Sequence, residues 1–276
     1  MPGVPAADLT GWGIPAVYTP WWDHTYVTSS CGLIWPCPNG SQCANGQALA
    51  TGVGNSIYAD CLSQVNSNAG LQYLKTGVCH QMANRILYPA KITVIGCRGY
   101  GRSTLRWGVF GKGPWPEKVT CIPLSGVLQA QSQVTGGDTM AVRHNQSVKL
   151  ETYHRAITKA HDAPADDEAT RLAELAALIE FSLGHPLEPT EFSLLADIQK
   201  SQRAADDNLA RSLEQGEISP EDFMLRSDDI SAEVMRKIFA LLGAERYRLI
   251  FGDEPPDARG MFDKETFLKT QASRRR

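Results

Sequence analysis

The sequence predicts an α+β domain over residues 1–145, followed by an all-α helical region over residues 146–276. Three observations support this division. Residues 21–30 have the aromatic and β-branched composition of a strand. Residues 76–87 repeat apolar side chains at helical spacing. After about Val142, glycine becomes rare, cysteine is absent, and Ala, Leu, Glu and Arg dominate.

The chain begins with a Pro- and Gly-rich lead, which we expect to be irregular up to Pro20. In the strand over residues 21–30, His24 is held between bulky neighbours. A turn at residues 30–31 would return the chain as a hairpin and set Cys37 across from His24. A histidine on a rigid strand is a candidate general base, although a lone strand histidine is more often structural.

The helix expected after Gly77 places Cys79 at its start, on the buried face, and Pro89 ends the pattern. Free backbone N–H groups and the positive end of the helix dipole favour a thiolate there. We therefore expect a lowered pKa for the Cys79 thiol. A small buried cysteine on an amphipathic helix is an equally good structural interpretation. The presence of His24 favours chemistry, because thiolate catalysis needs a base as well as a nucleophile.

Residues 97–113 are Gly-rich and carry several cations, for which one interpretation is a basic rim that binds an anionic substrate. The GxxxxGK pattern followed by Ser or Thr is absent, which excludes a phosphate-binding loop. The structural interpretation is a pair of strands joined by glycine turns. The other expected elements are a Gly- and Asn-rich loop over residues 38–55, a short helix over 56–65 that contains Cys61, a core strand over 91–96, a strand over 119–127 and a polar loop over 129–138.

Amphipathic periodicity and capping signals predict helices over residues 166–183, 190–214 and 231–251, with a helix start at Ser219 and Pro220. Helices this regular, with short turns, form a bundle or an extended helical array. We expect the C-terminal Ser-Arg-Arg-Arg to be disordered. We expect surface positions for two histidines seven residues apart, His154 and His161.

The motifs DHTYV at residues 23–27 and GVCHQMANRI at residues 77–86 resemble the circularly permuted branch of the papain-like cysteine hydrolases. That branch includes NlpC-type cell-wall peptidases, the lecithin:retinol acyltransferase group and bacterial lipoprotein-hydrolase relatives. Its histidine strand precedes its cysteine helix, as in this chain. The resemblance covers residues 21–113. Val78-Cys79-His80 departs from the Asn-Cys-Glu motif of the acyltransferase group, so acyl-transfer specificity is not implied.

The resemblance implies a permuted papain-like fold and a cysteine peptidase or amidase, with Cys79 as nucleophile and His24 as base. The Cys79 N–H at the helix start would help to bind the oxyanion. His80 points about a quarter-turn away from Cys79 on the helix and is not expected to be the base. A third residue should orient His24. Three candidates are not separated by the sequence: Asn55, Asp60 and Gln81.

The first choice of substrate is bacterial cell-wall peptidoglycan, cleaved by a toxin or effector that is delivered without a standard secretory signal. The helical region would then position substrate or bind an immunity or delivery protein. One alternative is a lipid or protein acyl hydrolase or acyltransferase of the same superfamily. Another is a non-catalytic adaptor whose helical half binds a partner. A Cys–His pair within reach would favour the enzymes, and a pair buried apart would favour the adaptor.

Composition narrows the classes of protein to consider. The 276 residues are 42% hydrophobic and 21% charged, the balance of a soluble globular protein, and a formal net charge of −3 gives no support for nucleic-acid binding. No apolar run is long enough to span a bilayer, so stable membrane insertion is not expected. The N-terminus lacks the basic and apolar regions of a secretory signal. We expect synthesis in the cytoplasm and, for a toxin, export to the periplasm by another route.

The odd number of cysteines, seven, leaves at least one thiol unpaired. Three disulfides with a free Cys79 would suit a protein outside the cytoplasm, whereas seven reduced thiols would suit a cytosolic one. Cys31, Cys37 and Cys43 lack the CxxC spacing of ordinary zinc sites, and no nearby histidine completes one. We therefore expect neither a metal nor a cofactor.

Overall fold

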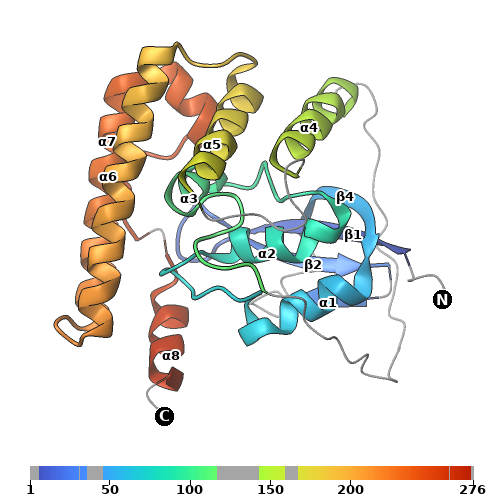
Figure 1. Cartoon of the computed structure of the whole chain (residues 1–276), viewed down its shortest axis with the longest axis horizontal. Coiled ribbons are helices and arrows are strands. Elements are labelled where there is room, and N and C mark those ends of the chain that lie inside the picture. The colour runs from blue at the N-terminus through green and yellow to red at the C-terminus, as the bar shows by residue number, and fades with distance from the viewer. Residues whose placement is uncertain are drawn as a thin grey trace.

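The computed structural model describes residues 6–30, 32–35, 46–116, 143–158, 167–260 and 262–274. These residues form a mixed α+β structure with one antiparallel sheet. The sheet and short helices lie on one side of the view in Figure 1, and two long helices, α6 and α7, lie side by side on the other. The predicted α+β class is confirmed.

The sheet has the strand order β3-β2-β1-β4, and all neighbours are antiparallel. The predicted strand around His24 and its hairpin are confirmed, while Cys37 lies outside the described residues. The irregular lead and the Gly- and Asn-rich loop were wrong predictions, because each contains a strand. The strands are β1 (Ala6–Pro15), β2 (Asp23–Ser29), β3 (Gly32–Trp35) and β4 (Gln47–Asn55).

Glycine in β1 is needed because a helix packs closely on the strand. A Cβ at Gly11 would lie 2.7 Å from Leu87 Cδ1 and 2.8 Å from Val94 Cγ1. Gly11 pairs with Val27, so this face of β1 and β2 points toward the helix. The glycine content makes this segment resemble a loop in the sequence. In the structure, the glycine allows the strand and the helix to lie in close contact.

Short helices follow the sheet in the sequence, and two of them were predicted. The predicted helices at residue 56 and at Cys79 are confirmed, and the second packs against the sheet. A third helix replaces the predicted strand pair over residues 97–113. The elements are α1 (Ser56–Gln64), η2 (Val65–Ser67), α2 (Cys79–Leu87), η3 (Tyr88–Ala90) and α3 (Tyr100–Trp107).

Left-handed glycines explain why α3 is a helix. Gly99 precedes it at φ 80° and Gly108 ends it at φ 77°, so glycines that suggested strand turns serve as helix boundaries. Whether two such glycines bound a helix or form strand turns depends on how the residues between them pack in the interior. All eight residues of α3 are buried.

The β-branched segment 91–96 is irregular rather than a strand. Lys91 adopts a left-handed φ of 58°, and the Val94 N–H donates to Asn84 Oδ1 at 2.9 Å instead of to a strand neighbour. The Thr93 N–H donates to His154 Nε2 at 3.1 Å. The surface prediction is therefore wrong for His154, which is buried, whereas His161 lies outside the described residues.

The second region is helical, as predicted. Ser219 caps the helix that follows it by accepting the Asp222 N–H at 3.0 Å, and Gly243 interrupts that helix at φ 74°. Residues 273–274 of the predicted disordered tail are helical, and residues 275–276 lie outside the described residues. The strand and loop expected over residues 119–138 lie outside the described residues. The helices are α4 (Arg143–Thr158), α5 (Glu168–Leu183), α6 (Pro189–Glu214), α7 (Pro220–Phe251) and α8 (Lys264–Arg274).

Side chains of both predicted regions share one hydrophobic core. Trp107 of α3 belongs to the same cluster as Leu178 of α5, Ile238 of α7 and Phe262. Helix α3 contacts α5, α6 and α7. The domain boundary between residues 145 and 146 stays a prediction. At α3, side chains of the two regions pack directly against each other, with no solvent layer between them.

Candidate active site around Cys79

Cys79 is the first residue of α2, where an extended Val78 turns into the helix. Val78 has no polar side chain, and Gln81 supplies the missing cap. Its Oε1 accepts the Val78 N–H at 3.2 Å, and its Nε2 donates to the Gly108 carbonyl at 3.0 Å. Gln81 thereby fixes the helical turn that carries the thiol. The Cys79 Sγ donates to the Asp23 carbonyl oxygen at 3.7 Å, which places the sulfur against the start of β2.

Burial governs the ionisation of the thiol. Cys79 is only 5% exposed, and desolvation raises its pKa. The N–H groups of Thr25 and His80 lower that pKa, as do the side chains of Trp22 and Thr25, but they do not outweigh desolvation. The predicted lowering by the helix start is therefore wrong for this conformation. The thiol is neutral at pH 7.

His24 lies on β2 and is 4% exposed. Strand alternation places it on the face shared with Tyr26, away from α2, whereas Thr25 points toward α2 and the Cys79 sulfur. The imidazole packs edge-on against the Tyr18 ring, with centroids 5.4 Å apart. Within the part of the chain that the structure describes, no group hydrogen-bonds to the His24 ring.

His24 and Cys79 lie at the same end of the sheet, but no hydrogen bond joins their side chains in the described residues. Burial lowers the pKa of His24, while the carboxylates of Asp263 and Asp23 act in the opposite direction. The pair is therefore a neutral thiol and a neutral imidazole. Tyr18 contacts the His24 ring. The pKa of the Tyr18 hydroxyl is raised by burial first, then by Tyr73 and then by Cys79.

Two buried hydroxyls near Cys79 have no hydrogen-bond partner among the described groups, Thr25 Oγ1 and Tyr18 Oη. The Tyr18 hydroxyl lies near that of Tyr73 without reaching hydrogen-bond geometry. Tyr73 Oη accepts the backbone N–H of Asp263 at 3.1 Å. A buried hydroxyl without a partner costs about 1–3 kcal/mol. Thr25 Oγ1 lies close enough to the Cys79 sulfur to lower the pKa of the thiol.

His80 has a structural role, as expected from its direction on the helix. Its Nδ1 lies 2.9 Å from Ser103 Oγ, and its Nε2 lies 2.9 Å from the Asp23 carbonyl oxygen. The ring stacks on Trp22 with centroids 4.6 Å apart. Burial lowers the pKa of His80 to about 4. Both ring nitrogens are occupied, so His80 is a neutral core residue at pH 7.

The three candidates for the residue that orients His24 are engaged in helix structure. Asn55 Oδ1 caps α1 by accepting the Tyr58 N–H at 3.0 Å. Asp60 Oδ2 accepts from Gln64 Nε2 at 2.9 Å, and Gln81 caps α2. None of them hydrogen-bonds His24 in the described structure. Their residue types suited the role, but each one serves its own helix.

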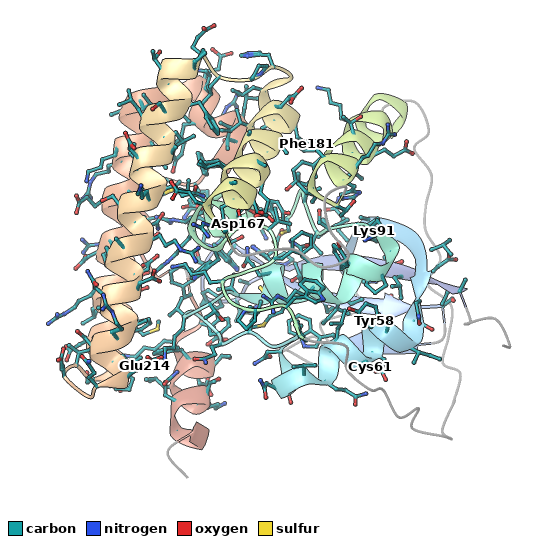
Figure 2. The ribbon with its side chains drawn as sticks, viewed as in Figure 1. Tyr58, Cys61, Lys91, Asp167, Phe181 and Glu214 are labelled. Carbon is teal, nitrogen blue, oxygen red and sulfur yellow. The ribbon has the colours of Figure 1, made fainter. Side chains whose placement is uncertain are left out.

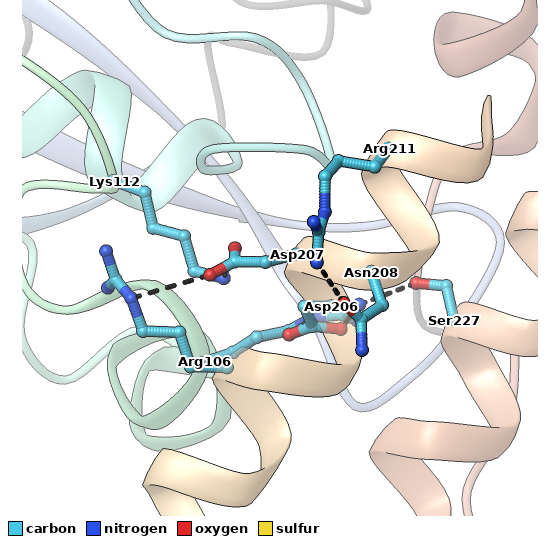
Figure 3. Close-up of polar contacts among 8 residues, drawn as sticks. Arg106, Lys112, Asp206, Asp207, Asn208, Arg211 and Ser227 are labelled. Carbon is cyan, nitrogen blue, oxygen red and sulfur yellow. Dashed lines mark hydrogen bonds and ion pairs between the residues drawn. The ribbon is translucent and has the colours of Figure 1, made fainter. Parts of the chain in front are cut away.

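The predicted basic rim over residues 97–113 is wrong, because each of its four cations is paired with a carboxylate. We call the three pairs that reach α6 and the segment after α7 the ion-pair seam; Figure 3 shows two of them. Arg98 pairs with Asp23 at 2.7 Å beside the site. The seam consists of Arg102–Glu254, Arg106–Asp206 at 2.6 Å and Lys112–Asp207 at 3.2 Å.

The described cysteines differ in oxidation state. Cys61 on α1 (Figure 2) is disulfide-bonded, whereas Cys79 and Cys97 are free and buried. Both predicted arrangements are therefore wrong, the three disulfides with one free thiol and the seven reduced thiols. Burial raises the pKa of Cys97 well above its ordinary value. The other four cysteines lie outside the described residues.

A cavity of about 430 Å³ lies between residues 95–101, α5 and the end of α7. Cys97, Arg98 and Glu254 line it, but Cys79 and His24 do not. Arg98 is the ion-pair partner of Asp23, whose carbonyl oxygen accepts a hydrogen bond from the Cys79 thiol. The cavity therefore adjoins the site without containing it.

Sequence reasoning found Cys79 and His24 and missed most of their surroundings. Tyr18 and Tyr73 lie in loops, where no periodicity marks them. Thr25 could have been found from strand alternation, because it occupies the face opposite His24. Asp263 had one sequence signal, the Asp-x-x-Thr pattern of a helix cap, but nothing in the sequence connects that cap to position 24.

Among the described residues, no cluster of three or more His, Cys, Asp or Glu is placed to hold a metal ion. No described helix combines the length and the apolar character needed to cross a bilayer. Comparisons with protein-family models, curated proteins and solved structures found no match.

Proposed function

We propose that the protein is a cysteine hydrolase that cleaves amide bonds, with Cys79 as nucleophile and His24 as base. One observation carries this proposal. The thiol at the start of α2 lies beside two buried hydroxyls, those of Thr25 and Tyr18, that have no hydrogen-bond partner among the described groups. Perturbed titratable groups gathered around a nucleophile are typical of active sites.

In the proposed reaction His24 removes the proton from Cys79 as the sulfur attacks the carbonyl carbon. The tetrahedral intermediate collapses, the C–N bond breaks, and the leaving amine takes the proton from His24. Water then attacks the thioester, giving its proton to His24, which returns one to the departing sulfur. In the described conformation the His24 ring lies on the face of β2 away from α2. This step therefore requires the imidazole to turn toward the sulfur when substrate binds, since catalytic hydrogen bonds often form only in the substrate complex.

Two features support stabilisation of the oxyanion. The Cys79 N–H lies at the start of α2, where backbone N–H groups have no partner within the helix. The Thr25 and Tyr18 hydroxyls lie near the same sulfur. Donors fixed before the reaction and shielded from water are the most effective ones for a developing negative charge.

The proposed substrate is bacterial peptidoglycan, which follows from the resemblance of the two motifs to permuted papain-like hydrolases. The order of elements agrees with that branch, since β2 with His24 precedes α2 with Cys79. On this proposal the protein is a toxin or effector, and its helical region binds a delivery or immunity protein. A lipid or protein acyl hydrolase of the same superfamily is the alternative substrate assignment.

A second candidate is a non-catalytic adaptor, and burial favours it. Cys79 and His24 are each at most 5% exposed, and desolvation raises the pKa of the thiol and lowers that of the imidazole. Both shifts oppose the thiolate–imidazolium pair on which cysteine peptidases depend. An adaptor would need neither group to react.

The two candidates differ in muropeptide release from purified cell-wall sacculi, followed by mass spectrometry. The hydrolase proposal predicts release by the wild-type protein and loss of about 10²-fold or more in Cys79→Ala and His24→Ala. Cys97→Ala is the matched control, because it removes the other free buried thiol. No release by the wild type, with small ester and peptide amide substrates also left intact, would favour the adaptor.

A further inference from the structure

A groove between α6 and α7 stays open in the described structure. The two helices lie side by side at one edge of the molecule (Figure 1), and a hollow of about 320 Å³ lies between them. Leu194, at its edge, is 54% exposed. Apolar side chains that gather in an exposed hollow are typical of protein–protein interaction sites. The lining is mostly apolar with one acid and one base, and consists of Leu194, Asp197, Ile198, Ser201, Val234, Lys237 and Leu241.

The groove uses a different stripe of each helix from the one that packs into the molecule. On α6 the groove residues recur every three or four positions over residues 194–201, and on α7 they do so over residues 234–241. A second stripe of α6 faces the interior, where Gln199 Nε2 donates to the Leu105 carbonyl oxygen at 3.0 Å. The helix pair therefore has one stripe for its own fold and one that is left for a partner. The buried stripe consists of Leu195, Gln199, Gln202, Asp206, Leu209 and Leu213.

One guanidinium nitrogen fixes the level of α6 against α7. Arg106 Nη2 donates to Asp206 Oδ1 at 2.6 Å and to Ser227 Oγ at 2.8 Å, so Asp206 and Ser227 lie across from each other. At the rise of an α-helix, Asp197 lies about 14 Å from Asp206 along α6, and Lys237 lies about 15 Å from Ser227 along α7. Both distances run in the same direction, because the helices are antiparallel. The acid and the base therefore lie at about the same level, on opposite sides of the groove.

Both charges are available to a partner. Asp197 is exposed and forms no ion pair with any described residue. Lys237 pairs with Glu233 of its own helix at 2.7 Å, and both side chains of that pair are more than half exposed. Such pairs are weak and exchange readily. A surface with one acid and one base at the same level is complementary to a second copy of itself that is turned by 180°.

We propose that this face is an interface between two copies of the chain, related by a two-fold axis that runs parallel to α6 and α7. Such an axis keeps every residue at its level and sets α6 of one copy against α7 of the other, in antiparallel direction. Asp197 of each copy then meets Lys237 of the other, so the charge pair forms twice. Leu194 lies nearly level with Leu241 of the other copy. The two helix pairs together form a four-helix bundle with antiparallel neighbours.

The apolar residues and the charges have separate roles in this interface. Removing Leu194, Ile198 and Leu241 of both copies from water supplies the attraction. The charges select the arrangement. A two-fold axis running across the helices at this level would set Asp197 against Asp197 and Lys237 against Lys237, which is repulsive. The groove residues all belong to α6 and α7, so the inference is independent of the chemistry proposed for Cys79.

The first test is the oligomeric state of the full chain, by sedimentation velocity from about 1 to 100 μM, where dimers of micromolar affinity form. We expect the wild type to dimerise and Leu194→Glu to raise the dissociation constant by about tenfold or more, because it buries a charge among apolar groups. Leu225→Glu is the matched control and should leave the constant unchanged. Leu225 is 66% exposed on α7, about half a turn away from Val234 around the helix.

The second test reverses the charges. Asp197→Lys and Lys237→Asp should each raise the dissociation constant about tenfold, because both charge pairs become like-charge contacts. An equimolar mixture of these two variants should dimerise as well as the wild type, since each contact then joins opposite charges. The double variant should also regain dimerisation, and its net charge equals that of the wild type. Circular dichroism of every variant checks that these exposed substitutions leave the helices folded.

Three results would overturn the inference. The first is a wild type that stays monomeric at about 100 μM. The second is a dimer that Leu194→Glu weakens no more than Leu225→Glu does, because its interface would then lie elsewhere. The third is a dimer whose dissociation constant is the same in the single charge variants as in their mixture, because the two-fold arrangement requires Asp197 to meet Lys237 of the other copy.

Discussion

The ion-pair seam, apart from the half-exposed Asp207, and the surroundings of Cys79 are both buried and polar, but they satisfy their polar groups differently. In the seam, Arg106 donates to both oxygens of Asp206 and to Ser227 Oγ. Around Cys79, Thr25 Oγ1 and Tyr18 Oη have no hydrogen-bond partner among the described groups. Some seam atoms also lack a hydrogen bond, namely Arg102 Nε, Arg106 Nη1 and both oxygens of Glu254, but ion pairs hold these side chains.

This contrast separates polar groups that hold the fold from polar groups that are available for chemistry. A paired buried cation fixes the position of α3 against α6 and α7, and its loss would leave an uncompensated charge. An unpaired buried hydroxyl contributes nothing to the fold and costs free energy. Removing a polar group of the seam should therefore destabilise the protein. Removing a polar group beside Cys79 should impair only the reactivity of the thiol.

The largest expected effect is at the centre of the seam. Asp206→Ala leaves the buried Arg106 guanidinium without its carboxylate and should lower the free energy of unfolding by about 3–5 kcal/mol. Urea denaturation measures the loss. Glu233→Ala is the control, because it breaks an exposed pair with Lys237 at 2.7 Å, and exposed ion pairs contribute little to stability. Equal losses in the two variants would show that the seam adds no particular stability.

The next effect depends on pH. Burial raises the pKa of Glu254 to about 7, with Arg102 acting in the opposite direction. The unfolded carboxyl loses its proton near its ordinary pKa of 4.5, while the folded one retains it to about pH 7. Glu254 therefore makes stability fall as pH rises through this window. Glu254→Gln should remove this pH-dependent loss of unfolding free energy, which is on the order of 3 kcal/mol over the whole window.

Stability must be compared between Glu254→Gln and wild type at each pH, because His80 and His154 act in the opposite direction. Burial lowers the pKa of each to about 4, so both favour the folded state as pH rises toward 6.5. A difference between the two proteins that stays constant from pH 4.5 to 7 would contradict the shift assigned to Glu254.

The smallest stability effect is expected beside Cys79. Thr25→Val replaces an unpaired buried hydroxyl by a methyl group of similar shape, and should raise the free energy of unfolding by up to about 1 kcal/mol. Ser227→Ala in the seam removes a hydroxyl that accepts from Arg106 at 2.8 Å, and should lower it by about 1–3 kcal/mol. Chemical denaturation of the two variants compares the sites directly. Destabilisation by Thr25→Val as large as that by Ser227→Ala would remove the contrast.

The sequence predicted helices better than strands, for reasons visible in particular residues. The periodicity of α2 and the cap at Ser219 identified those helices correctly. Strand β1 was missed because Gly11, which suggested a loop, is required for the close approach of Leu87. The segment 91–96 was misassigned because Asn84, from another element, takes the hydrogen bond of Val94.

The candidate site was predictable only in part. The helix start and the strand located Cys79 and His24, because both placements depend on local pattern. The ionisation of Cys79 was not predictable, since burial by distant segments outweighs the helix start. The contribution of the C-terminal segment was not predictable either, because only the packing of Phe262 against Trp22 brings that segment beside β2.

The most direct test of the central claim compares the two free thiols within one molecule. Cys79 and Cys97 are both buried, and both have raised pKa values, Cys97 more strongly. After brief iodoacetamide treatment from pH 7 to 10, peptide mass mapping gives the alkylation rate of each. We predict that both rates rise with pH and that Cys79 reacts about tenfold faster, the effect of one unit in thiol pKa, with the difference reduced in Thr25→Val. Equal rates, or a faster Cys97, would contradict the assignment of Cys79 as the reactive centre.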